Sequence, residues 1–258
     1  MLLLRSLVFD VLLYALMGVV GILGAPMAIW SVDGAYRVMK TYCRLAFALL
    51  RGLCGLRIEV RGAVPTGEVI VCAKHQSFLD IMMLMYVLPR PKFIMKKELR
   101  WAPILGLYAL RIGSTPVARG ARSKAMKDMV AHAERDGADA GQLVIYPQGT
   151  RVAPGARLPF KVGAGVLYER MGTACVPVAT NAGVLWGRRA LVKHAGLAVV
   201  EFLPPIEPGL AVVEFLEPIA PGLPIPEFMA RIETVVEANS DRLMREAGFA
   251  PPEQAGSA

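Results

Sequence analysis

Residues 68–88 read EVIVCAKHQSFLDIMMLMYVL and decide how the chain is interpreted. A short apolar run of strand character ends at Lys74, and an apolar helical pattern begins at Phe78. His75 is therefore expected at the end of a strand, and Asp80 in the first turn of a helix. A histidine at a strand end is well placed to face a cleft, where its imidazole can act as a base near neutral pH.

The spacing of His75 and Asp80 admits two interpretations. In the catalytic one, the carboxylate bonds one ring nitrogen and fixes the tautomer of a base that takes a proton from a hydroxyl group. In the structural interpretation, Ser77 caps the helix, the acidic side chain of Asp80 stabilises its first turn, and His75 merely ends a strand. Spacing alone leaves both open. The chain has no GxSxG motif, so we assign Ser77 to capping rather than to nucleophilic attack.

From residue 55 onward, short apolar runs alternate with helical patterns. Such alternation predicts an α/β domain in which helices cover a sheet. Strands are predicted near 57–60, 68–73, 92–95, 115–118, 142–146, 174–179 and 198–203. Helices are predicted near 78–88, 97–111, 121–135, 163–171 and 226–247.

A tandem repeat interrupts this pattern. Residues 197–209 read LAVVEFLPPIEPG, and residues 210–222 repeat them as LAVVEFLEPIAPG. Because both copies encode the same strand, only one can take the native place in the sheet. The other is expected at an edge or in a looped-out insertion, where change is tolerated.

The first 54 residues are predicted to anchor the chain to a membrane. Residues 11–30 contain no charged side chain and match the length of a membrane-spanning helix. The alternatives are a signal peptide or a hairpin broken near Gly24 and Pro26. Basic residues are more frequent after this segment than before it. By the positive-inside rule we expect the rest of the chain in the cytoplasm, at the inner membrane.

Two basic segments follow the apolar one. In residues 35–53, four cations share one stripe of a predicted amphipathic helix, which indicates an interfacial helix or an ordinary solvated face. These cations are Arg37, Lys40, Arg44 and Arg51. Residues 92–111 combine lysines with Trp101 and Tyr108, which favour the headgroup level of a membrane, so this segment is expected on the same surface.

Composition supports an anionic membrane surface as the partner. The chain has 29 Lys and Arg against 21 Asp and Glu, a net charge of +8, and is 55% hydrophobic but only 19% charged. A basic chain suits nucleic acid or anionic lipid, and this hydrophobicity favours lipid, so we predict no nucleic-acid partner. The four cysteines match no metal-binding spacing, so we predict neither a metal site nor a disulfide framework.

Three further segments carry residues suited to binding phosphate. YPQGTR follows a predicted strand and supplies Gly149, which permits close backbone approach, and Arg151, whose guanidinium can bind phosphate through two N–H groups. GSTPVAR places Arg119 at the end of another short strand, and PFK adds Lys161. Each signal is weak alone, but together with HQSFLD they form a specific set.

This set resembles the glycerolipid acyltransferase family over most of residues 30–245. HQSFLD, GSTPVAR, YPQGTR and ACVPVA match the four motifs of that family and occur in its order. The resemblance implies an α/β fold with a helix-covered mixed sheet, preceded by a membrane helix and an amphipathic interfacial helix. It places the acyltransferase domain at residues 55–248, after the anchoring helices of residues 1–54, with a flexible tail at 249–258.

The resemblance also implies a reaction. His75 would be the general base and Asp80 would orient it. The acyl chain would pass from acyl-CoA or acyl carrier protein to the sn-2 hydroxyl of lysophosphatidic acid, giving phosphatidic acid, with no cofactor beyond the donor. The residues expected to bind the acceptor are Arg119, Gln148, Gly149, Thr150, Arg151 and Lys161.

Gln148 departs from the family, whose third motif commonly has Glu at this place. An amide keeps the size and hydrogen-bonding capacity of a carboxylate but loses its negative charge. Two alternatives therefore stay open: transfer to another lysolipid, such as a lyso-ornithine lipid, or a catalytically weak membrane protein that binds lipid.

Overall fold

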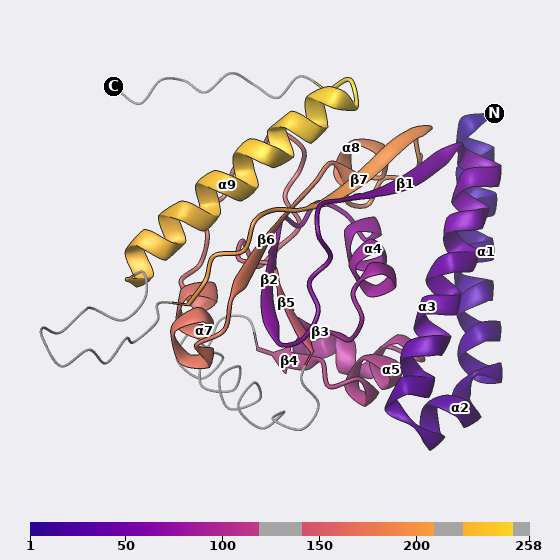
Figure 1. The fold of residues 1–258 in the computed structure, drawn as a ribbon. Helices are drawn as coiled ribbons and strands as arrows, with labels where there is room; N and C mark the ends of the chain where they lie inside the picture. The colour runs from indigo at the N-terminus through magenta and orange to yellow at the C-terminus, as the bar shows by residue number, and fades with distance from the viewer. Residues whose placement is uncertain (119–140, 209–223, 250–258) are drawn as a thin grey trace, which may run out of the picture.

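The computed structural model describes residues 1–118, 141–208 and 224–249 (Figure 1). Four predictions fall outside these residues: the position of Arg119, the helix near 121–135, the second copy of the tandem repeat and the flexible tail beyond residue 249. The first copy is described and forms a strand of the sheet.

Among the described residues, seven strands form one sheet in the order β1-β7-β6-β2-β5-β3-β4. Neighbouring strands run parallel except β6 and β7, which are antiparallel, so the expected mixed sheet is confirmed. The strands are β1 (Leu56–Arg61), β2 (Val69–Ala73), β3 (Pro91–Lys96), β4 (Thr115–Val117), β5 (Gln142–Ile145), β6 (Cys175–Thr180) and β7 (Gly196–Phe202). Each matches a predicted strand within about two residues.

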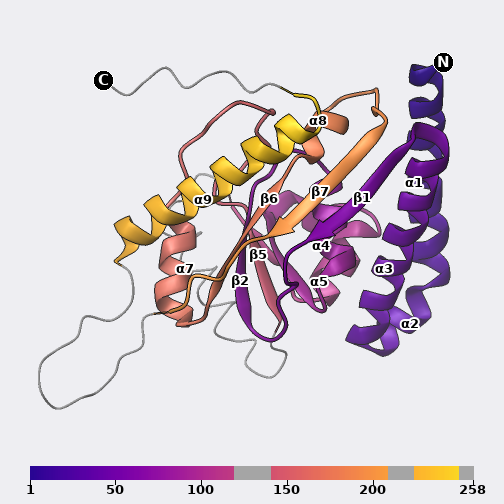
Figure 2. The ribbon, with the colours of Figure 1, turned by 45° about the horizontal axis from the view of Figure 1, so that its top comes forward.

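Helices cover both faces of the sheet (Figures 1 and 2). In β2, Ile70 and Cys72 face the core shared with α7 (Gly163–Met171) and α9 (Ile225–Glu246). Val71 and Ala73 face the opposite core, which α4 (Leu79–Val87) and the N-terminal helices complete. Strands buried on both faces read as continuous apolar runs, which is why β2, β5 and β6 lack polar alternation. A four-residue helix, α8 (Ala182–Leu185), follows β6.

The single helix predicted near 97–111 is two elements. A 3₁₀ turn over Lys97–Trp101 is followed by α5 (Leu105–Arg111). Pro103 separates them, because the residue before a proline is disfavoured in the helical conformation, and Ala102 is extended here. Ile104 has a positive φ of 61° at the joint.

The apolar N-terminus forms a helical hairpin rather than one helix over residues 11–30. The elements are α1 (Leu2–Leu23), α2 (Ala25–Trp30) and α3 (Val32–Leu49), with a π-helical turn over Leu50–Cys54. The break falls at Gly24, where an added Cβ would lie 2.6 Å from the Val38 side chain, and Pro26 lies in the first turn of α2. α1 and α3 lie side by side in Figures 1 and 2. Of the helices described, α1 is long and apolar enough to cross a membrane.

The hairpin is attached to the domain along its length. Ser6, Phe9 and Leu13 of α1 are buried, and the Ser6 hydroxyl accepts a hydrogen bond of 2.9 Å from the Lys193 amide. Asp10 pairs with the buried ammonium of Lys193 at 2.5 Å. α1 is therefore packed against the domain on one side and apolar and exposed on the other.

The two basic segments are only partly as predicted. Arg37, Arg44 and Arg51 are exposed on or just after α3, but Lys40 donates a 2.6 Å hydrogen bond to the Leu88 carbonyl, so it leaves the stripe. Among residues 92–111, Trp101 is exposed, whereas Lys92 and Tyr108 are buried and the Tyr108 hydroxyl donates to the Gly21 carbonyl. The residues of this segment that are free to meet a surface include Trp101 and, on α5, Leu107 and Leu110. All four cysteines are unpaired and buried.

Candidate functional site

Two adjacent parallel strands bring the HQSFLD and YPQGTR segments together. β2 and β5 pair in register, with Cys72 opposite Ile145, so the segments that follow them leave the same edge of the sheet. A hydrogen bond of 2.8 Å from the Val152 amide to the His75 carbonyl joins the two segments directly.

His75 and Asp80 form a buried hydrogen-bonded pair. The His75 Nδ1 lies 2.9 Å from Asp80 Oδ1, and Asp80 Oδ2 accepts from the amides of Gln76 and Ser77 at 2.7 Å each. Because a carboxylate oxygen only accepts, Nδ1 donates, and in the neutral imidazole Nε2 then has a lone pair. The Ser77 hydroxyl accepts from the Leu79 amide at 3.1 Å, but the N-cap of α4 is Phe78 and no side chain caps the helix, so the predicted cap by Ser77 is wrong.

Tyr146, the first residue of YPQGTR, stacks on His75. The ring centroids are 4.1 Å apart and the planes differ by 22°. Burial raises the pKa of the Tyr146 phenol well above its ordinary value, and the charge of Asp80 raises it further. The phenol therefore stays protonated, and its ring restricts rotation of the imidazole. Sequence reasoning missed this residue, although its place directly after β5 was available as a signal.

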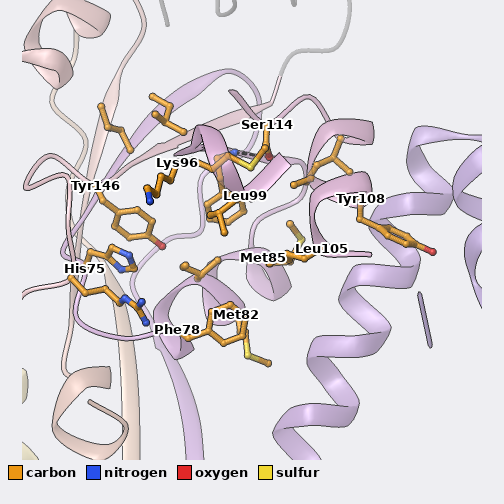
Figure 3. Close-up of a pocket in the computed structure, with 18 of the residues that line it drawn as sticks. His75, Phe78, Met82, Met85, Lys96, Leu99, Leu105, Tyr108, Ser114 and Tyr146 are labelled. Carbon is orange, nitrogen blue, oxygen red and sulfur yellow. Dashed lines mark hydrogen bonds between the residues drawn. The ribbon is translucent and has the colours of Figure 1, made fainter. Parts of the chain in front are cut away.

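His75 lies at the wall of a cavity of about 950 Å³ (Figure 3). Near His75 the wall carries Tyr146, and further away it is apolar, with Met82 and Met85 from α4 and Tyr108 from α5. The cavity continues to the N-terminal hairpin, where the lining residues are Met17, Val20 and Gly21 of α1 and Val38, Met39, Tyr42 and Cys43 of α3.

The polar part of the cavity carries the predicted phosphate-binding residues. Gly149, Thr150, Arg151 and Lys161 all line it, and Arg188, which the sequence did not single out, lines it as well. Gly149 has φ 69°, a conformation that favours glycine, and a Cβ there would lie 2.7 Å from the Lys161 Nζ, so any larger residue would also displace that ammonium group. This combination of cations and a close backbone approach suits a phosphate group.

Gln148, which was expected to bind the acceptor, lies away from the cavity. It is buried and does not line the cavity. Its Nε2 donates to Glu237 Oε1 of α9 at 3.1 Å and to the Leu158 carbonyl at 3.3 Å. The expected contact with the acceptor is thus replaced by a contact with α9. Arg119 lies outside the described residues, and among those that are described no three His, Cys, Asp or Glu gather to hold a metal.

Comparison with known proteins points to one family. A family model described as Acyltransferase matches residues 57–181. The 1-acyl-sn-glycerol-3-phosphate acyltransferase of Pseudomonas aeruginosa is 28% identical over 204 residues, which cover 78% of this chain and 79% of that protein. The Escherichia coli protein of the same name is 31% identical over 170 residues, or 62% of this chain and 67% of its own. The human alpha protein of this name is 32% identical, with 59% of its length covered.

A solved structure shows the same fold. The crystal structure of the 1-acyl-sn-glycerophosphate (LPA) acyltransferase PlsC from Thermotoga maritima aligns with a TM-score of 0.71, covering 94% of this chain and 99% of the other, at 18% identity. The likeness extends well beyond residues 57–181, so the N-terminal hairpin and α9 belong to the shared architecture.

Proposed function

This chain belongs to the 1-acyl-sn-glycerol-3-phosphate acyltransferase family, and on that basis we propose that it transfers an acyl chain from a thioester to the sn-2 hydroxyl of lysophosphatidic acid. The products are phosphatidic acid and a free thiol. The observation that carries the proposal is the His75 imidazole, held by Asp80 on one nitrogen and located where a largely apolar cavity meets a cationic loop.

In the proposed reaction His75 serves as base and then as acid. Its Nε2 accepts the proton of the sn-2 hydroxyl as the oxygen attacks the thioester carbonyl, and the imidazolium that forms is stabilised by Asp80. Collapse of the tetrahedral intermediate breaks the carbon–sulfur bond, and the proton on His75 passes to the departing thiolate. No bond to the enzyme forms, and no cofactor beyond the donor is needed.

The cavity supports a long acyl chain as the transferred group. A volume of about 950 Å³ lined by methionine and aliphatic side chains can exclude water from a hydrocarbon chain. Burial contributes about 0.8 kcal/mol for each CH₂. The methionines of α4 suit this purpose, because their flexible thioethers adapt to chains of different shape.

The acceptor phosphate is proposed to bind at Gly149, Thr150, Arg151 and Lys161. These residues and His75 line the same cavity, which supports binding of one acceptor molecule to both. Acyl-CoA and acyl carrier protein both present the acyl chain as a thioester, and we propose one of them as the donor.

We further propose that the protein works at the cytoplasmic face of the inner membrane. Several large apolar side chains of the hairpin and of α5 are exposed, among them Trp30, Ile29 and Leu107. Together with the apolar outer side of α1 they give the protein a surface suited to lipid, and Arg37 and Arg44 suit anionic headgroups.

A thiol-release assay with the purified protein tests the proposal. Acyl-CoA and acyl carrier protein are supplied as separate donors, with lysophosphatidic acid present or absent. We expect thiol release that depends on the acceptor and yields phosphatidic acid. Release without acceptor would indicate hydrolysis, transfer only to a lyso-ornithine lipid would change the acceptor, and no release with any pairing would favour a lipid-binding protein.

A further inference from the structure

A buried ion pair lies on the opposite side of the catalytic segment from the cavity. Lys74 directly precedes His75, and its ammonium group pairs with the Glu237 carboxylate of α9. The two residues are only 1% and 3% exposed. Since successive residues of an extended chain face opposite sides, Lys74 points toward α9 while His75 lines the cavity.

The same carboxylate holds the second site segment. One oxygen of Glu237 pairs with Lys74, and the other accepts the 3.1 Å hydrogen bond from the Gln148 amide. Lys74 follows β2 and Gln148 follows β5, so a single side chain of α9 connects both segments that form the site. A shift of Glu237 would move His75 relative to Arg151.

The charges packed around Glu237 balance, with one carboxylate for each cation. The other charged groups packed here are Arg157 and Asp241, which pair with each other at 2.5 Å, while Arg157 approaches Glu237 only to 3.8 Å. Lys74 therefore depends on Glu237. A glutamate at position 148 would place a second negative charge about one hydrogen-bond length from the Glu237 carboxylate, whose other oxygen already pairs with the buried Lys74 ammonium.

We propose that Glu237 is a positioning residue for acyl transfer: through Lys74 and Gln148 it fixes the two site segments relative to each other. It supplies from α9 the negative charge that the neutral Gln148 lacks. This inference rests on the proposed function, because the reaction is the activity that Glu237 is said to support.

A charge-relocation cycle tests the proposal. Glu237→Gln removes the carboxylate, Gln148→Glu adds a second, and the double variant Gln148→Glu/Glu237→Gln moves one carboxylate from the helix to the loop. We expect each single variant to lower kcat by at least about tenfold with KM changed less than about threefold, and the double variant to recover kcat to within about threefold of the parent.

Asp241→Asn is the matched control. It removes a carboxylate from the same helix, one turn away, whose ion-pair partner is Arg157 rather than Lys74 or Gln148. Its kcat is expected within about twofold of the parent. A loss equal to that of Glu237→Gln would mean that any charge removed from α9 matters, and the proposal would be wrong.

Amide hydrogen exchange gives a readout that does not depend on turnover. The amides of Gln76, Ser77 and Val152 are bonded within or between the two segments. We expect faster exchange at all three in the single variants and restored protection in the double variant. If the parent protein fails to acylate lysophosphatidic acid, the proposed function fails, while this exchange pattern still decides whether Glu237 holds the segments.

Two results would overturn the inference. One is an additive effect, in which the fold-loss of kcat in the double variant equals the product of the fold-losses in the two single variants. The other is a single variant that unfolds at a lower temperature yet keeps the parental kcat and exchange, which would reduce Glu237 to a stabilising contact. Should Glu237→Gln not fold, the comparison of Gln148→Glu with the double variant still decides the case.

Discussion

At the residue scale, Asp80 performs two tasks with its two oxygens. One orients His75, and the other accepts from two backbone amides at the start of α4. The Asp80 carboxylate thus makes the contact with His75 that the catalytic interpretation predicts, together with backbone contacts just before α4, while the predicted cap by Ser77 is absent. A substitution at Asp80 will mix the two effects, so His75 is the better residue for a test of chemistry.

His75→Ala should lower kcat by about 10²- to 10⁴-fold, the usual contribution of a general base. The unfolding temperature should change little, because Asp80 keeps both of its amide donors when the imidazole is removed. Steady-state kinetics and calorimetry on the same preparation separate the two quantities. Near-parental turnover would remove His75 from the mechanism.

Arg151→Lys should raise the KM for lysophosphatidic acid about tenfold and leave the KM for the donor within about twofold. Lysine keeps the charge but loses the planar arrangement of N–H groups that binds a phosphate through two bonds. Initial rates measured with each substrate varied in turn provide the comparison. Equal effects on both constants would indicate that Arg151 supports the loop rather than the acceptor.

At the element scale, strands were easier to predict than helix ends. A buried strand needs only a short apolar run, so the run VIVCA and its counterparts located the whole sheet. Gly24 and Pro103 decide where helices break, and their effects depend on a neighbouring helix or on one backbone angle, which hydropathy does not report. The contact between Gln148 and Glu237 joins residues 89 apart and carries no local signal at all.

The exposed arginines of the α3 stripe should contribute to membrane binding through charge alone. Replacing Arg37, Arg44 and Arg51 together by Gln should weaken binding to anionic vesicles about 100-fold at low salt, at about 1 kcal/mol for each basic residue near such a surface. The difference should shrink as salt screens the interaction. Sedimentation with anionic and neutral vesicles measures both affinities. An equal loss on neutral vesicles would show that the substitutions damage the fold instead.

At the scale of the whole molecule, segments from both ends of the chain meet at one site. The N-terminal hairpin lines the far part of the cavity, the segments after β2 and β5 supply polar lining, and α9 contacts these segments from the other face of the sheet. Interactions that attach the hairpin are therefore expected to affect both stability and activity.

The pair formed by Asp10 and Lys193 tests that coupling. Asp10→Asn leaves a buried ammonium without its carboxylate and should destabilise the protein by about 2 kcal/mol, or about 4–8 °C in unfolding temperature. Adding Lys193→Met removes the ammonium and should recover most of the loss. Thermal unfolding in a mild detergent measures both variants. If the double variant is less stable than Asp10→Asn, the charge is not the cause.

The buried state of the four cysteines has a practical consequence. Burial raises the pKa of the Cys43 thiol to about 12 and raises those of Cys54 and Cys175 as well, so the reactive thiolate is scarce in the folded protein. The native cysteines should therefore react with maleimide reagents only very slowly. A cysteine introduced at the exposed position Trp30 or Trp101 would then be the dominant labelling site. A polarity-sensitive dye attached there would report, without removal of any native cysteine, how deeply each end of the surface enters a bilayer.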